Sequence, residues 1–414
     1  MKIDNVISNL KRSDNSRAKG SSMNFVKIEG DGILQFWESE ATRPKQFKGA
    51  GNNGRKALAD LTKKELRNCL VHPFKTLKEI RQEQLERIKY LVNMAYNEIP
   101  VYRKKYGAIG FTPDQLKTWD DFQRLPIMTK DELIEAFPQS CVNSRWSMDD
   151  LFTTRSFGTS GKTLPIKVNL ESILKDTLQG VRQFWLQSGM RYGADDMLSM
   201  IYTVPWWFEN VDDKFASSFI SGIIHPEKVA QILDNLKPHV ISCYPTTLKG
   251  LIPYWSMWDN SNLYLIVVHS EGSTRSERLS WSKQLGVPVL DEYSSEEATR
   301  MALECPCGHY HVCEDSVYLE VLDPKSHTPV PDGQSGIAVA TNLLNESMPF
   351  IRYFQGDFIS RPKDPSPCLI GWSQLASIDG RVNDSFINAH GRVVPAGVIL
   401  DVLYRWQHDN SICL

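Results

Sequence analysis

The residues best suited to chemistry form a short loop that is rich in glycine and hydroxyl groups. Glycines let successive backbone N–H groups converge on one anion, hydroxyls add short donors, and a lysine places positive charge beside phosphate oxygens. The residues with these properties are Ser156, Gly158, Thr159, Ser160, Gly161, Lys162 and Thr163. Ser156 stands where a Walker A loop needs glycine, so the pattern is a different one. It indicates a polyphosphate-binding loop, although ordinary surface turns favour the same residue types.

Three later segments combine carboxylates, aromatic rings and arginines. They are Tyr-Ser-Ser-Glu-Glu at 293–297, Pro-Phe-Ile-Arg-Tyr-Phe-Gln-Gly-Asp at 349–357 and Gly-Arg-Val-Asn-Asp at 380–384. Together with the loop, and in the same order, they resemble the signature segments of the acyl-adenylate-forming (AMP-binding) enzymes, and most closely those of the phenylacetate-CoA ligase family. The resemblance extends from about residue 85 to residue 395. This sequence departs from the family pattern at Phe157, Thr163, Glu296 and Asn383.

The resemblance implies a role for each matched residue in binding ATP and Mg²⁺. The loop from Ser156 to Thr163, with its glycines Gly158 and Gly161, would surround the phosphates. The individual roles are the β- and γ-phosphates for Thr159, Ser160 and Lys162, the adenine for Tyr293, Mg²⁺ for Glu297, the ribose hydroxyls for Asp357, and the ribose or α-phosphate for Arg381. Lys162, Glu297 and Arg381 are the residues expected to act in catalysis.

The implied reaction is ATP-dependent adenylation of a carboxylic acid, with release of pyrophosphate. Fixed donors and a metal offset the repulsion between the carboxylate and the phosphates, so a nucleophilic Ser or Cys triad is not needed. The activated acyl group would pass to an amine, a carrier-protein thiol or another acceptor. The alternatives are a CoA ligase that needs a C-terminal domain in trans, and a nucleotide-binding scaffold without turnover.

A cluster of aromatic residues follows one predicted strand, where ligand clefts of open α/β sheets lie. Its members are Tyr202, Trp206, Trp207, Phe208, Phe215 and Phe219. We expect an aromatic or otherwise planar carboxylic acid to stack there, with an interior aromatic patch as the alternative.

A second chemically active group lies in the segment Glu-Cys-Pro-Cys-Gly-His-Tyr-His-Val-Cys. Thiolates and imidazoles so close together are typical of zinc sites, although the common finger has two residues between its cysteines and this segment has one. We expect Cys305, Cys307 and His311 to bind a structural Zn²⁺, with Cys368 or alternatively Cys313 as the fourth ligand. A reduced loop without metal is the other interpretation.

The elements that position these residues alternate between strand-like and helix-like patterns. Strand-like apolar runs lie at 197–204, 239–243, 263–268, 316–321 and 336–341. Runs of this length separated by crossover helices indicate an α/β fold. We therefore expect a large adenylate-forming domain with mixed sheets flanked by helices.

Two helices before the loop also have clear sequence signals. Ile88, Val92 and Ala95 form one helical stripe that ends at Ile99, because the residue before a proline disfavours the helical conformation. Thr129 and Glu132 have the spacing of a capping box and predict the start of a second helix.

The ends of the chain lack these patterns. Residues 1–72 have no apolar period and predict a flexible arm, 73–379 form the large domain, and 380–414 form a hinge and the stub of a C-terminal domain. The family's C-terminal domain carries a lysine that orients the acyl carboxylate. We expect most of that domain, and that lysine, to be absent here.

Composition excludes several classes of protein. The 414 residues include 47 basic and 49 acidic side chains, a net charge of −2, which argues against a basic nucleic-acid coat. An apolar run long enough to span a bilayer and a secretory signal are both missing from the sequence. We expect a cytoplasmic protein with neither nucleic-acid nor membrane partners.

Overall fold

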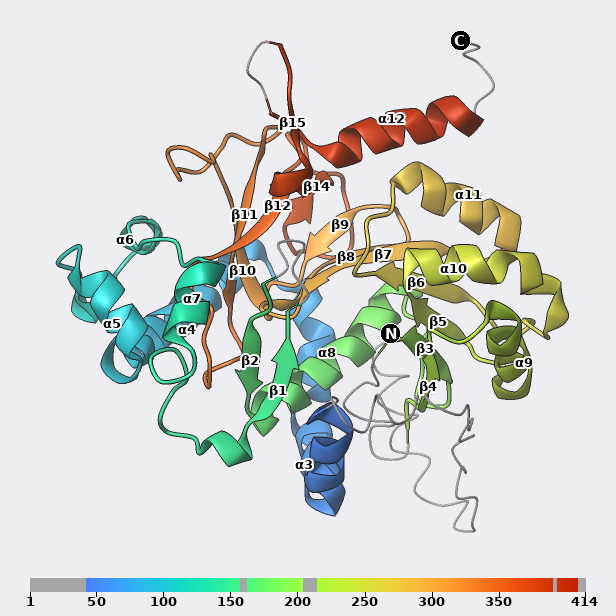
Figure 1. Ribbon diagram of the computed structural model, residues 1–414, viewed down its shortest axis with the longest axis horizontal. Helices are drawn as coiled ribbons and strands as arrows, with labels where there is room; N and C mark the ends of the chain where they lie inside the picture. Colours follow the sequence, from blue (N-terminus) through green and yellow to red (C-terminus); the bar gives the residue numbers. More distant parts are fainter. Residues whose placement is uncertain (1–41, 157–161, 204–213, 390–392, 409–414) are drawn as a thin grey trace.

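The structure is a computed structural model that describes residues 42–156, 162–203, 214–389 and 393–408. Two sheets form its centre: an eight-stranded mixed sheet with helices on both faces, and a four-stranded antiparallel sheet beside it (Figure 1). This arrangement confirms the predicted α/β class with mixed sheets and flanking helices.

The eight-stranded sheet contains all the strands predicted between residues 197 and 268. Its strands are β3 (Leu198–Tyr202), β4 (Ser217–Ser221), β5 (Val240–Cys243), β6 (Leu265–His269), β7 (Val289–Ser295), β8 (Thr299–Glu304), β9 (Tyr310–Val312) and β13 (Gln374–Leu375). The order is β13-β9-β8-β7-β6-β5-β3-β4, and the strands from β4 to β7 are parallel. Every residue of β5 and β6 is buried, as continuous apolar runs predict for strands covered on both faces.

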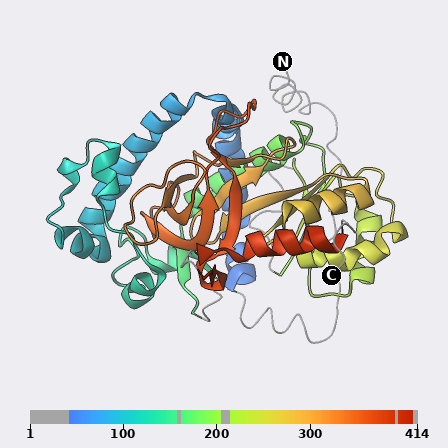
Figure 2. The same ribbon diagram turned by 90° about the horizontal axis from the view of Figure 1, so that it is seen from above.

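Helices cover both faces of the parallel strands. They are α8 (Leu170–Gln187) on one face and α9 (Pro226–Leu236), α10 (Pro245–Leu251) and α11 (Arg275–Leu285) on the other (Figures 1 and 2). Alternate residues of each strand point to opposite faces. Accordingly, Val267 of β6 packs in the core with Leu178 of α8, and the next residue, Val268, packs with Leu233 of α9 and Leu248 of α10.

The four-stranded sheet has the order β10-β11-β12-β14. Its strands are β10 (Val317–Leu322), β11 (Ser335–Asn342), β12 (Tyr353–Ser360) and β14 (Ser377–Arg381), and the helices on this side of the molecule are α4 (Leu77–Glu98), α5 (Pro100–Gly107), α6 (Trp119–Gln123) and α7 (Lys130–Ala136). The predicted stripe of α4 is buried and the helix ends before Ile99, as expected. The predicted capping box of α7, Thr129 with Glu132, is also present.

Short elements connect these layers and complete the chain. They are the hairpin β1 (Phe152–Arg155) and β2 (Pro165–Val168), the hairpin β15 (Phe386–Ile387) and β16 (Val393–Val394), the helix α12 (Ala396–His408), and the 3₁₀ helices η2 (His72–Phe74), η3 (Pro113–Gln115), η4 (Met148–Asp150), η5 (Ile252–Met257) and η6 (Val382–Asp384). Both views place α12 beside α11 (Figures 1 and 2).

The N-terminal region differs from the prediction of a flexible arm up to residue 72. Residues Thr42–Val71 form the helix α3, which packs against α8. Leu58, Leu66 and Leu70 are buried in the main core, so the prediction was wrong for this part of the arm. Their spacing in multiples of four puts them on one helical face, a signal hidden by the polar residues around them. Residues 1–41 lie outside the described residues, and the other domain boundaries stay predictions.

Among the described residues, no helix is both long enough and apolar enough to cross a bilayer. The cytoplasmic location stays a prediction.

Candidate functional site

Three residues singled out from distant segments meet where the two sheets adjoin. Tyr293 lies on β7, Asp357 on β12 and Arg381 at the end of β14. The Tyr293 hydroxyl donates to Oδ2 of Asp357 at 2.7 Å, and Arg381 Nε lies 3.2 Å from Oδ1 of the same carboxylate. Tyr293 and Asp357 are buried, whereas 43% of the Arg381 side chain is exposed. The cluster therefore presents a carboxylate and a partly exposed cation side by side.

Strand pairing and two glycines fix this geometry. Asp357 and Arg381 are direct partners in the register of β12 and β14, so their side chains must be neighbours. Gly356 and Gly380, which precede them, have φ of +80° and +99°, a conformation that glycine adopts with little strain. Arg381 also donates from Nη1 to the carbonyl of Gln355 at 2.8 Å. The paired segments Gly-Asp and Gly-Arg thus hold the arginine over the aspartate.

Glu297 lies close by, at the turn between β7 and β8. Its buried carboxylate accepts a hydrogen bond from the Tyr353 hydroxyl at 3.0 Å, and its backbone carbonyl accepts one from Asn342 Nδ2 at 2.9 Å. Burial raises the pKa of Glu297, although the positive charge of Lys130 acts in the opposite direction. A carboxylate held in this way is stabilised further by a cation, which makes Glu297 suited to a hard metal ion such as Mg²⁺.

Burial likewise raises the pKa of Asp357, and Arg381 and the Tyr293 hydroxyl oppose that shift. Both carboxylates are therefore buried acceptors that gain from positive partners or hydroxyl donors. The hydroxyls of a ribose are such donors.

The predicted phosphate loop connects β1 to β2, and its two ends are side by side. The backbone N–H of Ser156 donates to the Leu164 carbonyl at 3.0 Å, and the Ser156 hydroxyl accepts from the Leu164 N–H at 3.1 Å. Lys162 and Thr163 are exposed, and Lys162 Nζ is 2.8 Å from Oδ1 of Asp131, the second residue of α7. The other predicted loop residues, Gly158, Thr159, Ser160 and Gly161, lie outside the described residues.

A hydrogen bond ties the base of this loop to the turn that carries Glu297. The Thr154 hydroxyl of β1 donates to Glu296 Oε2. Lys130 and Asp131 begin α7, so one helix end provides both the charge near Glu297 and the partner of Lys162. The structure thus places the described part of the loop, Glu297 and the start of α7 in one neighbourhood.

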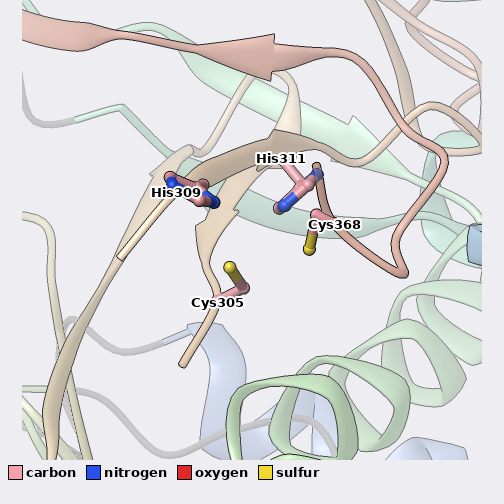
Figure 3. A group of neighbouring side chains, drawn as sticks. All are labelled: Cys305, His309, His311 and Cys368. Carbon is pink, nitrogen blue, oxygen red and sulfur yellow. The ribbon is translucent and has the colours of Figure 1, made fainter. Parts of the chain in front are cut away.

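A separate group of cysteines and histidines gathers at one end of the larger sheet. Cys305, His309, His311 and Cys368 each offer a ligand atom, and these atoms all lie within 4.8 Å of one another. Figure 3 shows the four side chains pointing toward a common centre. Two thiols and two imidazoles at this separation match the donor set of a tetrahedral zinc site.

The hairpin formed by β8 and β9 explains which side chains take part. Leu303 pairs with His311, and the N–H of Cys305 donates to the carbonyl of His309 at 2.8 Å. Side chains two residues apart share a face of a strand, so Cys305, His309 and His311 emerge on the same side. The segment that carries Cys368 leads to β13, which pairs with β9.

Two of the predicted metal ligands are not part of this group, and His309 takes the place expected for Cys307. The hairpin turns at Cys307 and Gly308, whose φ is +78°, and Cys307 is exposed at its tip. Cys313 lies beyond the end of β9 and is buried in the main core, where burial raises the pKa of its thiol to about 12. Cys307 and Cys313 therefore lie outside the group, whereas Cys305, His311 and Cys368 belong to it, and their binding of a metal stays a prediction.

Polar atoms without partners support a metal at this place. Among the described residues, Nδ1 of His309 and Nε2 of His311 are buried and have no hydrogen-bond partner. The other ring nitrogen of His311 lies 3.4 Å from the carbonyl oxygen of Trp372, the kind of contact that orients a metal-binding imidazole. Because unpaired buried polar atoms are costly, a cation between these rings would relieve two of them at once.

The aromatic cluster expected to receive the acid is only partly within the described residues. Trp206, Trp207 and Phe208 lie outside them. Phe215 is buried in the core against Tyr192, with ring centroids 5.6 Å apart, and therefore supports the interior interpretation. Tyr202 lies at the end of β3, where the prediction places a ligand.

Sequence reasoning missed two residues of these sites. Tyr353, the partner of Glu297, belongs to the Arg-Tyr pair of the predicted segment but was given no role. His309 was missed because spacing along the chain does not show which side chains share a face. A hairpin turning at Cys307 and Gly308 pairs Cys305 with His309, so their side chains lie on the same side.

Known proteins resemble this chain in sequence and in fold. A scan against family models found no match. The phenylacetate-coenzyme A ligase of Aromatoleum evansii is 27% identical over 330 residues, covering 75% of this chain and 72% of that protein. The enzyme of the same name from Escherichia coli K12 is 24% identical over 363 residues, covering 82% and 80%.

A solved structure of 2-hydroxyisobutyryl-CoA ligase, in an open conformation with 2-HIB-AMP and CoA, matches with a TM-score of 0.69 at 23% identity, covering 80% of this chain and 81% of that one. At this identity the match shows that the two chains share a fold. By sequence this chain is similar to phenylacetate-coenzyme A ligases, and by fold it is similar to 2-hydroxyisobutyryl-CoA ligase.

Proposed function

We propose that this protein activates a carboxylic acid with ATP and Mg²⁺, releases pyrophosphate, and passes the acyl group to an acceptor thiol or amine. The observation that carries the proposal is the contact of Tyr293 and Arg381 with Asp357, together with the hydrogen bond of Glu297 to Tyr353 on β12, the strand that carries Asp357. These residues come from three separate segments of the chain. Their types and order match the segments identified from the sequence. The names of the similar proteins, phenylacetate-coenzyme A ligases, describe the same chemistry.

The cluster around Asp357 is suited to the nucleoside. The Asp357 carboxylate would accept hydrogen bonds from the ribose hydroxyls, and Tyr293, held by its own hydrogen bond to Asp357, would pack against the adenine. Arg381 is partly exposed, and its guanidinium can turn toward the ribose or the α-phosphate while its backbone stays fixed by β14.

Glu297 and the loop would hold the charged part of ATP. Glu297 would bind Mg²⁺, which neutralises phosphate charge and makes the α-phosphorus easier to attack. Lys162 would leave Asp131 for the β- and γ-phosphates, since its exposed ion pair is a weak interaction to give up. The backbone of the loop from Ser156 to Thr163, with Thr159 and Ser160, would complete the phosphate contacts.

The reaction needs positioning and charge neutralisation. A carboxylate oxygen of the acid forms a bond to the α-phosphorus, the bond from that phosphorus to the bridging oxygen breaks, and pyrophosphate leaves with the electron pair. Two anions approach each other in this step, so Lys162 and Arg381 lower the barrier by stabilising charge. In the second step an acceptor attacks the acyl carbon and AMP leaves.

We propose CoA as the acceptor to test first, because the similar proteins are named as CoA ligases. An amine and a carrier-protein thiol are the competing acceptors. An aromatic or planar acid is the expected substrate, and phenylacetate is the first probe.

We also propose that Cys305, His309, His311 and Cys368 bind a structural Zn²⁺. Four protein donors are the number that a tetrahedral structural zinc site requires, so they would leave no position for substrate. The ion would join the hairpin to the segment that precedes β13 and hold the edge of the larger sheet in place.

Acid-dependent exchange between ATP and labelled pyrophosphate tests the proposal. We expect exchange that requires both Mg²⁺ and an acid, and subsequent formation of a thioester when CoA is added. Exchange without thioester would assign the acceptor to the amine or carrier class. Absence of exchange with every acid, in protein shown to bind ATP, would favour the scaffold interpretation and overturn the proposal.

A further inference from the structure

A row of four polar or aromatic side chains crosses the larger sheet at the carboxyl ends of its parallel strands. Ile201, Cys243 and Val268 are partners in register on β3, β5 and β6, so Tyr202, Tyr244 and His269 follow them at one level. His269 in turn pairs with Glu292 of β7. Gln183 of α8 donates to Glu292 Oε2 at 2.6 Å, which places the row on the face that α8 covers.

Three rings of this row form a compact cluster. The ring centroids of Tyr202 and His269 are 4.4 Å apart, those of Tyr244 and His269 are 5.5 Å apart, and those of Tyr202 and Tyr244 are 5.6 Å apart. Such contacts fix the position of the imidazole, because rings packed on two sides leave little freedom to turn. His269 is only 4% exposed.

Among the described residues, the polar atoms of these three side chains have hydrogen-bond partners, with one exception. The Tyr202 hydroxyl is 3.0 Å from Ser242 Oγ, the Tyr244 hydroxyl is 2.9 Å from Thr203 Oγ1, and His269 Nδ1 is 2.7 Å from Ser270 Oγ. Nε2 of His269 is buried and has no partner. An unpaired buried nitrogen in an otherwise satisfied cluster calls for a ligand.

The position of the row relates it to the proposed nucleotide site. Glu292 directly precedes Tyr293 on β7, so their side chains lie on opposite faces of this strand but at the same end of the sheet. The helix α8 follows the hairpin that carries the phosphate loop. Ligands of open α/β sheets bind beyond the carboxyl ends of the strands. An acid attacking the α-phosphorus must lie beside the nucleotide, and the row lies at these same ends of the strands.

We propose that His269 is a specificity-determining residue, whose Nε2 hydrogen-bonds a hydroxyl group on the acyl part of the carboxylic acid. This inference rests on the proposed function and narrows its substrate class from planar acids to hydroxylated ones. Tyr202 and Tyr244 supply the aromatic surface beside that hydroxyl.

A hydroxyl is the group that fits the imidazole best. The His269 ring is neutral, since burial lowers its pKa to about 4, with Glu292 opposing and Arg300 reinforcing the shift. Depending on the direction of the bond to Ser270, Nε2 of a neutral ring is either a donor or an acceptor. A hydroxyl can serve as the partner in both cases, whereas a methyl or an unsubstituted ring carbon can serve in neither.

Pyrophosphate exchange with a matched set of acids tests this inference. The set consists of phenylacetate, the three isomeric hydroxyphenylacetates and mandelate. The quantity measured is kcat/KM for each acid. We expect at least one hydroxylated acid to exceed phenylacetate by ~10-fold or more, because the acid without hydroxyl leaves Nε2 unpaired. In His269→Leu the ratio should fall to about one, and in His269→Gln, which keeps a hydrogen-bonding group, it should be partly retained.

The ratio separates specificity from damage to the fold, since a structural defect lowers the rate with both acids alike. His239→Gln is the matched control, because His239 directly precedes β5 and so lies at the opposite end of the strand from Tyr244. Its ratio should equal that of the wild type. The inference is overturned if phenylacetate equals every hydroxylated acid in the wild type, or if His269→Leu keeps the wild-type ratio. If none of the acids supports exchange, the proposed function is refuted, and this inference with it.

Discussion

The cysteine and histidine group offers a prediction in which two similar substitutions should behave differently. Cys368→Ala removes a member of the group, whereas Cys307→Ala removes an exposed thiol at the tip of the hairpin. The sequence predicted both cysteines as ligands, but only Cys368 belongs to the group in the structure. We expect wild-type protein to hold about one zinc per chain, Cys307→Ala to hold the same amount, and Cys368→Ala to lose it.

The size of the effect follows from the chain length that the metal closes. His311 and Cys368 are 57 residues apart, and a cross-link closing a loop of that length restricts the unfolded chain by about 4 kcal/mol. The pairing of β9 with β13 closes much of the same loop, so 4 kcal/mol is an upper value. At ~2 cal/mol/K per residue for 414 residues, this free energy corresponds to a fall in Tm of up to about 5 °C.

The assay combines metal analysis of purified protein with thermal unfolding of the three proteins at equal concentration. Loss of zinc and of up to about 5 °C in Cys368→Ala alone would support the site. Equal loss of zinc in Cys307→Ala, or zinc-free wild type after growth with zinc, would refute the ligand set.

Four further predictions follow from other contacts. Lys162→Ala should lower acid-dependent pyrophosphate exchange by ~10²-fold or more, as the loss of one preorganised donor does. Glu297→Gln should cause a similar loss. Because burial raises the pKa of Glu297, the activity of the wild type at limiting Mg²⁺ should begin to fall at a higher pH than an ordinary glutamate would produce. Arg352→Met should reduce the free energy of unfolding by about 3–5 kcal/mol in chemical denaturation, because it leaves the buried Glu320 carboxylate without its partner at 3.0 Å. His269 is neutral in the fold, and burial lowers its pKa from 6.5 to about 4, so the unfolded chain binds the proton first. The fall in the free energy of unfolding between these pH values should therefore be about 3 kcal/mol larger in the wild type than in His269→Gln.

Matched surface variants serve as controls for these measurements. Lys175→Ala on α8 and Glu227→Gln on α9 should exchange pyrophosphate like the wild type, so an equal loss in either would contradict the assigned roles. Arg145→Met breaks an exposed ion pair with Glu98 and should cost at most about 1 kcal/mol. A similar cost for Arg352→Met would contradict the view that burial makes its ion pair important. An equal fall in stability between pH 6.5 and 4 in the wild type and in His269→Gln would contradict the pKa assigned to His269.

Signals local to the sequence predicted much of the fold. The capping box at Thr129 and the stripe of α4 mark helices because caps and apolar spacing act within one or two turns. The buried strands β5 and β6 were predicted for the same reason, since burial on both faces requires an uninterrupted apolar run. The helix α3 was missed because its few buried leucines are spread over a long polar sequence.

The candidate sites depend on contacts that the sequence does not display. Asp357 and Arg381 could be recognised as segments of a known type, but their pairing across β12 and β14 is a matter of register. His309 belongs to the cysteine and histidine group in place of Cys307 because the chain turns at Gly308. Tyr202, Tyr244 and His269 become neighbours only when their three strands pair in register. Spacing along the chain cannot reveal side chains that become neighbours through strand pairing.

The central claim, that a carboxylate attacks the α-phosphorus of ATP in this protein, is tested most directly with an isotope. The wild type is incubated with ATP, Mg²⁺ and hydroxylated arylacetic acids labelled with ¹⁸O in the carboxylate, and hydroxylamine is added to capture the acyl group. The account predicts an acyl hydroxamate together with AMP that carries one ¹⁸O, as read by mass spectrometry. Unlabelled AMP, or ADP and labelled phosphate in its place, would contradict it.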